Sequence, residues 1–305
     1  MRVKTACRSF SDCDLLDSSI ADTLFPDETN EQEATRRMAS IAQLRDRARK
    51  MYREIKTPWA YPRFPDPPRE FLPPEKFLEL VSETVLTHHT KINHPFCVKL
   101  VRGEWSIKQL QAWAKQDYHA KVQTLRNDAY IVATAPTLEE LQEQVKVLIS
   151  ECGEDLVGGK YPSHPELWLR FAEGLGMKRE EIRKSEPSPL MQVVLDAERY
   201  KSMKQSVGDL PANLRVGEKI NAVVHPIWAE AFREKYHVPE KALDFFTAHG
   251  EADQDHGKLG EQIVLSRAVT PEVQRAIWLH LKKGQAKQWV TYDAFSQAAL
   301  QAADQ

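Results

Sequence analysis

Prolines and glycines divide most of this chain into segments with helical periodicity. Pro136 follows the end of one such segment, whereas Pro211, Pro239 and Pro271 stand at the starts of others, where a missing N–H group costs little. Between these breaks, apolar residues recur every three to four positions, as on one face of a helix. Glycines number only 12, and alternating Val/Ile patterns are few, which argues against a large β content. The sequence therefore predicts an all-α bundle of about eight helices.

Side-chain caps define several starts of these helices. Ser106 is an expected N-cap, and Thr137 and Ser163 are each followed three residues later by a glutamate, as in a capping box. The expected helices of the bundle span residues 74–91, 106–135, 137–150, 164–174, 188–206, 212–236, 240–267 and 270–300.

The part of the chain that ends at Leu72 differs from the rest. Residues 1–27 have no apolar period, which indicates a flexible N-terminus. Residues 29–56 carry apolar positions at helical spacing and a charged outer face. Seven prolines follow between Pro58 and Pro74, so this stretch is expected to be an extended strap that docks through its aromatic residues. We expect a flexible segment at 1–27, a helix and strap at 28–72, and the bundle at 73–305.

Composition and charge exclude several classes of protein. The formal net charge of −2 and the pI near 6.6 give no global case for binding nucleic acid or an anionic membrane. The sequence has no apolar run of the roughly 18 residues that a membrane span needs, and its start lacks the apolar core of a signal peptide. The four cysteines show no disulfide or zinc-finger spacing. We expect a cytoplasmic protein.

Three metal-competent side chains interrupt the apolar face of the helix expected around residues 245–264. With His249 as the origin of a helical wheel, Asp253 falls at about 40° and His256 at about −20°. All three therefore lie on the stripe that also carries Phe245 and Phe246, and each would cost several kcal/mol if buried without a partner. Imidazole with carboxylate suits iron, manganese or zinc. Two core histidines bridged by an aspartate are the alternative.

Partners for such a metal must come from other helices. Glu151, Glu154 and Asp155 end one helix, and His164 starts the next after a glycine-rich turn. Helix termini that flank a loop can bring a carboxylate and an imidazole together, although Glu154 could equally be solvated and His164 could merely cap its helix. Glu218 lies seven residues before His225, on the same helical face, and a carboxylate at the inner face would be costly without a cation. From the local residues alone, a solvated position of Glu218 on the surface is favoured.

Other polar residues have weaker cases. Tyr118 and His119 could line a pocket, or could be satisfied core and rim residues. Cys152 lies near a histidine in the sequence, but it has no evident base and no oxyanion loop, so a nucleophilic role is not favoured.

The segments INHPFCVKLVRGEWSIKQLQAWAKQDYH, SHPELWLRFAEGLG and AHGEADQDHG resemble the TenA/PqqC family, which has the haem-oxygenase-like helical fold. The resemblance covers residues 73 to 295. Within that superfamily, the motif His-x3-Asp-x2-His at His249, Asp253 and His256 is most similar to the haem-oxygenase-like diiron oxidases and oxygenases.

The resemblance implies a set of metal ligands. Glu154 and His164 match an earlier carboxylate and histidine of the diiron enzymes, with Glu151 as a substitute. Glu218 matches a further glutamate by its distance from His249, but an alignment on Pro226 and Trp228 places Ala222 there instead. The expected cofactors are two Fe(II) ions, or one firmly bound and one labile, and O2 is the co-substrate.

The resemblance also implies an activity. We expect an O2-dependent oxidase or oxygenase acting on a small organic metabolite, such as an amino acid, a fatty acid or an aromatic compound. Tyr118 and His119 would line its pocket, and Arg126 could pair with a substrate carboxylate if it points inward. A homodimer is compatible with the family.

Two alternatives remain open. One is a cofactorless PqqC-like oxidase that uses His94, His119 and His256 as acid and base. The other is a non-enzymatic bundle that binds a small ligand.

Overall fold

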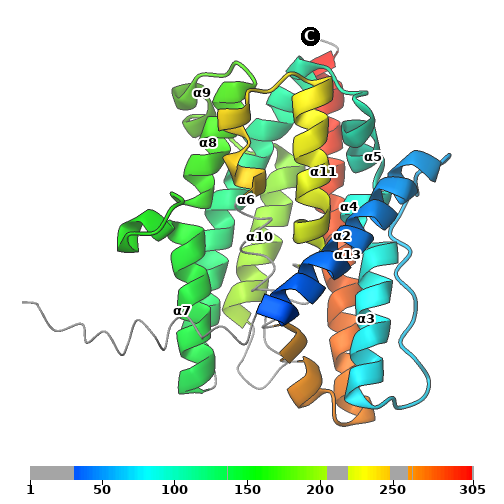
Figure 1. Ribbon diagram of the computed structural model, residues 1–305. Coiled ribbons are helices and arrows are strands. Elements are labelled where there is room, and N and C mark those ends of the chain that lie inside the picture. Colours follow the sequence, from blue (N-terminus) through cyan, green and yellow to red (C-terminus); the bar gives the residue numbers. More distant parts are fainter. Residues whose placement is uncertain (1–30, 136, 205–218, 248–259, 263, 304–305) are drawn as a thin grey trace, which may run out of the picture. The chain divides into compact units, whose positions relative to one another are not determined.

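The computed structural model describes residues 31–135, 137–204, 219–247, 260–262 and 264–303 (Figure 1). The chain divides into two units, residues 1–43 and 44–305. The described part of the first unit is the N-terminal portion of helix α2 (Glu31–Glu54). The remainder of α2 and all later helices belong to the second unit.

The prediction of an all-α fold is confirmed for the described residues, which form helices and, apart from one isolated bridge between Gly153 and Pro162, no β-structure. The α-helices of the second unit after α2 are α3 (Pro74–His88), α4 (Thr90–Asn93), α5 (Pro95–Arg102), α6 (Ile107–Ala133), α7 (Leu138–Cys152), α8 (His164–Gly174), α9 (Arg179–Arg183), α10 (Pro189–Lys204), α11 (Lys219–Lys235) and α13 (Pro271–Ala303). Two 3-10 turns, η2 (Glu154–Val157) and η4 (Glu240–Ala242), lie between them.

Helix α6 is the central element of the second unit. It packs against α7, α8, α10 and α13, and α13 runs alongside it (Figure 1). Its N-terminus has the expected cap, because Ser106 Oγ accepts a hydrogen bond from the Gln109 amide while the Gln109 side chain accepts one from the Ser106 amide. The buried residues of α6 include Gln116, Asp117, Gln123 and Asp128. The central helix therefore carries polar groups into the interior.

The main core is built from aromatic side chains. The ring of Trp113 on α6 lies 5.2 Å from that of Trp168 on α8 and stacks on Phe232 of α11 at 6.0 Å. Phe246 packs against Phe171 at 5.1 Å and against Phe232 at 5.0 Å. Because truncation of such a buried ring costs about 3–5 kcal/mol, this cluster fixes the positions of α6, α8, α11 and the segment around Phe246.

A second apolar cluster holds the proline-rich strap. Phe64 is buried and its ring lies 5.7 Å from that of Trp278 on α13. The Trp278 indole N–H donates to the Pro65 carbonyl, and the side chain of Gln274 bonds both the amide and the carbonyl of Leu72. Of the aromatic residues expected to dock, Phe64 does so, whereas Tyr61 and Phe71 are exposed.

The C-terminal part of α2 joins the main core through Tyr52, which is 1% exposed. Its hydroxyl donates to the carbonyl of Lys91 at 2.5 Å and accepts from the indole N–H of Trp228 at 3.2 Å. This tyrosine thereby links α2 to α4 and α11.

Candidate metal centre and adjoining cavity

A buried carboxylate–imidazole pair joins the end of α7 to the start of α8. Oε2 of Glu151 lies 2.5 Å from Nδ1 of His164, and the two side chains are 10% and 5% exposed. Because a carboxylate can only accept, the imidazole Nδ1–H is the donor in this contact. Burial of either group alone would be costly, so each depends on the other or on a further partner.

The glycine-rich loop between the helices creates this pair. Gly153 ends α7 with a φ of 127°, and a Cβ there would lie 2.6 Å from Oδ1 of Asp155 and 2.9 Å from the amide nitrogen of Ser163. Only glycine fits this close approach. The bridge from Gly153 to Pro162 closes the loop, and Ser163 then caps α8 by accepting from the Glu166 amide at 3.3 Å. The last turn of α7 and the first turn of α8 are therefore held together.

The structure changes which glutamate accompanies His164. Sequence reasoning placed Glu154 in that role and Glu151 as its substitute. Glu151 lies in the last turn of α7 and faces His164, whereas Glu154 starts the η2 turn and is only partly buried, with its backbone carbonyl accepting from the Gly159 amide at 2.9 Å. The turn rotates the chain between the two positions, so the pair contains Glu151 rather than Glu154.

Phe245 lies beside this pair and connects it to other polar groups. Its ring, 1% exposed, is 5.7 Å from the ring of His164 and 6.0 Å from that of His225 on α11. The ammonium of Lys121 lies 4.9 Å from the centre of the same ring and 3.2 Å from the carboxylate of Asp117. Two histidines and a lysine therefore surround one aromatic ring.

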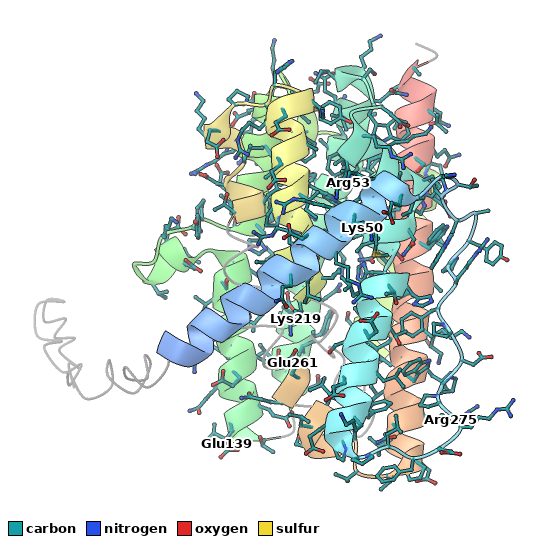
Figure 2. All side chains as sticks on the ribbon, turned by 45° about the vertical axis from the view of Figure 1, so that its right-hand side comes forward. Lys50, Arg53, Glu139, Lys219, Glu261 and Arg275 are labelled. Atoms are coloured by element: carbon teal, nitrogen blue, oxygen red, sulfur yellow. The ribbon has the colours of Figure 1, made fainter. Side chains whose placement is uncertain are left out.

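The predicted triad His249, Asp253 and His256, and also Glu218, lie outside the described residues. Their described neighbours in the sequence do meet. Lys219, which directly follows Glu218, forms a 2.7 Å ion pair with Glu261, five residues after His256 (Figure 2). Ala222, the alternative to Glu218, is fully buried in α11.

His225 is a buried polar residue with a defined partner. The ammonium of Lys91 lies 3.0 Å from Nε2 of His225, pairs with the amide oxygen of Asn221, and lies 5.6 Å from the centre of the Trp228 ring. Because the ammonium can only donate, Nε2 of His225 is the acceptor. In the sequence, only its position seven residues after Glu218, on the same helical face, singled out His225.

Three further expectations can be compared with the structure. His119 is half-buried and its Nε2 lies 3.2 Å from Oγ of Ser185, in the α9–α10 connection, and burial lowers its pKa. Tyr118 is also half-buried and packs against the main core. Adjacent residues on a helix point about 100° apart, so they face different surroundings. Arg126 is exposed on the outer face of α6, so the condition set for its pairing with a substrate carboxylate, an inward position, is not met.

A cavity of about 230 Å³ lies between α6, α10 and α13. Its apolar lining comes from Ile131, Met191, Val194 and Leu195, and its polar lining includes Gln123, Asp128, Glu198 and Lys287. Burial raises the pKa of the Cys152 thiol, and the negative charges of Asp128 and Glu151 raise it further. Helix α6, which lines the cavity, also packs against α7, whose last turn carries Glu151 and Cys152. A raised pKa keeps the Cys152 thiol protonated, which opposes a nucleophilic role.

The donors at this site suit a metal, although the described residues alone do not complete a site. Among the residues that the structure describes, no three His, Cys, Asp or Glu side chains are grouped so as to hold an ion. The buried Glu151–His164 pair nevertheless supplies one oxygen and one nitrogen donor, a combination typical of iron, manganese and zinc sites. In the described helices, no segment is long and apolar enough to cross a membrane.

Comparison with solved structures defines the fold. A domain of unknown function with a heme oxygenase-like fold from Shewanella denitrificans matches with a TM-score of 0.55 and 15% identity, over 73% of this chain and 90% of that one. A TenA homologue from P. horikoshii matches with a TM-score of 0.52 and 16% identity, over 76% of this chain and all of that one. The protein therefore has the haem-oxygenase-like helical fold.

Sequence comparison agrees with the fold. The model of the TENA/THI-4/PQQC family matches residues 83–210. A pyrroloquinoline-quinone synthase from Acinetobacter baumannii is 27% identical over 193 residues, 62% of this chain and 74% of the relative. A 4-aminobenzoate synthase from Chlamydia muridarum is 28% identical over 208 residues, 66% of this chain and 83% of the relative. The resemblance to the TenA/PqqC family is confirmed, and the closer likeness to its diiron relatives stays a prediction.

Proposed function

We propose that this protein is an O2-dependent non-haem iron enzyme that oxidises a small organic metabolite. The observation that carries the proposal is the buried Glu151–His164 pair beside Phe245. Four residues after Phe245 the sequence presents His249, followed by Asp253 and His256 at helical spacing. The relatives named as synthases of pyrroloquinoline quinone and 4-aminobenzoate support an enzymatic, oxidase-type role.

The proposed ligands come from three parts of the chain. Glu151 and His164 would supply one carboxylate and one imidazole, and loss of the proton that now joins them would free both groups for an ion. His249, Asp253 and His256 supply the remainder, and Glu218 is the candidate for a second ion. Glu151 here takes the place that the sequence alone gave to Glu154. Without metal, the hydrogen bond between Glu151 and His164 satisfies both groups.

When bound, iron would supply the redox chemistry and the binding position for O2. The chain's own residues prepare the surroundings. Phe245 and Trp168 exclude water on the side of His164, since their buried rings lie 4.9 Å apart. Lys121, which lies above both rings and pairs with Asp117, places a positive charge beside the same region. Such a charge stabilises anionic oxygen or a substrate carboxylate.

Iron content tests this proposal. The protein is reconstituted anaerobically with Fe(II), freed of excess metal, and assayed for iron. We expect one to two equivalents per chain, and a value below about half an equivalent would exclude an iron enzyme, because a complete set of buried His and carboxylate ligands binds metal tightly. The variant His256→Ala should lose iron while keeping the helical circular dichroism spectrum; retained iron would place the metal elsewhere.

The pyrroloquinoline-quinone synthase relatives favour a second candidate, a cofactorless oxidase in which histidines act as acid and base. His94 was one of the expected groups. Its Nδ1 accepts from the Phe96 amide and its Nε2 lies 3.1 Å from Asp293, so both ring nitrogens already have partners. This candidate predicts O2 uptake with substrate by metal-free protein, whereas the iron enzyme requires reconstitution.

A further inference from the structure

The cavity between α6, α10 and α13 has one apolar side. Met191, Val194 and Leu195 line it from α10, and Ile131 lines it from α6. All four side chains are buried. At about 230 Å³ the cavity is smaller than the roughly 300–1,000 Å³ of drug-sized pockets. Methionine sulfur makes favourable contacts with aromatic rings, so this side suits a flat apolar body of one ring.

The polar side of the cavity contains both donors and acceptors. Lys287 is the one cationic residue of the described lining, and its ammonium pairs with the Glu198 carboxylate. An ammonium has three N–H donors, so this pair leaves Lys287 able to bind a second anion. The hydrogen-bond acceptors of the lining are more numerous than this single cation. They include Asp128 and Gln123, each 3% exposed, and Glu198. The side-chain amide nitrogen of Gln123 donates to Asn127 at 2.9 Å, so the acceptor end of the Gln123 side chain is its carbonyl oxygen.

We propose that this cavity binds a small aromatic acid that carries an amino or hydroxyl group, with its carboxylate at Lys287 and its N–H or O–H donor at the carboxylates and amides of α6 and α10. The ring would lie against Met191 and Leu195. The inference deepens the proposed function by naming a substrate class, and it rests on that function only for the reaction that follows binding. Helix α6, which lines the cavity, also packs against α7, the helix whose last turn carries Glu151.

Binding to metal-free protein tests the inference. Isothermal titration calorimetry with 4-aminobenzoate and 4-hydroxybenzoate should show one site per chain. Benzoate, which lacks the donor, and aniline, which lacks the carboxylate, should each bind at least about 10-fold more weakly, since each loses one hydrogen bond to a charged group. If neither substituted acid binds with a Kd below about 1 mM, or if aniline binds as well as 4-aminobenzoate, the inference is overturned.

Variants of Lys287 locate the site. Lys287→Met should weaken 4-aminobenzoate binding about 10-fold. This is the low end of the loss expected when a hydrogen bond to a charged group is removed, because the Lys287 side chain is 40% exposed. Lys283→Met removes an exposed lysine of the same helix and should change nothing. The double variant Lys287→Met/Glu198→Gln removes the carboxylate that the first change leaves unpaired. If the double variant recovers full affinity, Lys287 does not contact the ligand and the proposed orientation is wrong.

A change in shape gives a second, charge-independent measurement. Ala120→Leu adds volume to the α6 wall of the cavity and should abolish 4-aminobenzoate binding without altering the helical spectrum or the thermal transition by more than a few degrees. Undiminished binding in this variant would place the ligand outside the cavity. All titrations use metal-free protein. Failure of the aromatic acids to bind therefore does not contradict iron binding, and a lack of iron does not affect the binding measurements.

Discussion

Glu151 and His164, thirteen positions apart in the sequence, meet at 2.5 Å because a closed loop returns the chain from the end of α7 to the start of α8. If this pair binds iron, Glu151→Ala removes both a ligand and the acceptor for Nδ1–H of His164. We expect the iron content to fall to less than a tenth of the wild-type value, given the 10- to 100-fold losses that follow even from changes behind the ligands.

The matched control is Glu154→Ala, which removes a carboxylate of the same loop that is only partly buried. It should retain iron. Equal losses in the two variants, measured by inductively coupled plasma spectrometry after anaerobic reconstitution, would show that Glu151 has no special role.

His94 makes the stability of the protein depend on pH. Burial lowers its pKa from 6.5 to about 4, against the opposing effect of Asp293. The folded protein therefore binds a proton here less readily than the unfolded chain, and stability that is fully present above pH 6.5 is lost as the pH falls toward 4. We expect this residue alone to lower the free energy of unfolding by about 2 kcal/mol between pH 7 and 4.5.

The variant His94→Asn isolates this contribution. Asparagine is a good N-cap and can still accept from the Phe96 amide, but it does not titrate. Urea unfolding at pH 7 and at pH 4.5 should give a smaller pH-dependent loss in the variant than in the wild type. His89, whose pKa burial also lowers, is present in both proteins and cancels in the comparison. Identical pH-dependent losses of stability in the variant and the wild type would show that His94 does not cause the pH dependence.

Tyr52 should contribute to stability through its hydroxyl. Tyr52→Phe keeps the ring but removes the hydrogen bonds to the carbonyl of Lys91 and from the indole N–H of Trp228. We expect a loss of about 1–3 kcal/mol in the free energy of unfolding, measured by urea denaturation followed by tryptophan fluorescence. Tyr61→Phe, at an exposed position of the strap, should stay within about 0.5 kcal/mol of the wild type.

Gln274 should hold the proline-rich strap in place. Its side chain bonds both the amide and the carbonyl of Leu72 as well as the carbonyl of Ala268. Gln274→Leu removes these bonds, so trypsin should cleave after Arg63 or Arg69 several-fold faster. The exposed ion pair between Lys282 and Asp66 also joins the strap to α13, but exposed pairs contribute little. Lys282→Gln should therefore leave the cleavage rate nearly unchanged, and the reverse ranking would show that the ion pair holds the strap.

Local chemistry made most helix starts predictable. Thr137 accepts from the Glu140 amide, and Ser163 accepts from the Glu166 amide, as their sequence patterns indicated. Such caps depend on residues three positions apart, so a single sequence contains the information. The segment between the helices expected at 74–91 and 106–135 was less well predicted, because His89 and His94 each cap a short helix, α4 and α5, with Nδ1. Histidine is uncommon in that role and gave no signal.

Helical periodicity groups only residues that share a helix. The spacing of His249, Asp253 and His256 could be interpreted from periodicity alone, and it stays a prediction. The choice between Glu151 and Glu154 depended on where α7 ends, which the strained backbone at Gly153 decides. The cavity could not be inferred at all, because Asp128, Glu198 and Lys287 come from three helices whose packing is set by the whole core.

The loop closed by Gly153 and Pro162 has a consequence for finding related proteins. Its tip residues Leu156 and Val157 are 75% and 67% exposed, and loops of this kind accept insertions and deletions readily. The distance in the sequence between the acidic residue and the histidine can therefore differ among homologues while their side chains stay in contact. Searches with a fixed-length motif would miss such proteins, whereas a profile anchored separately on the last turn of one helix and the first turn of the next would retrieve them.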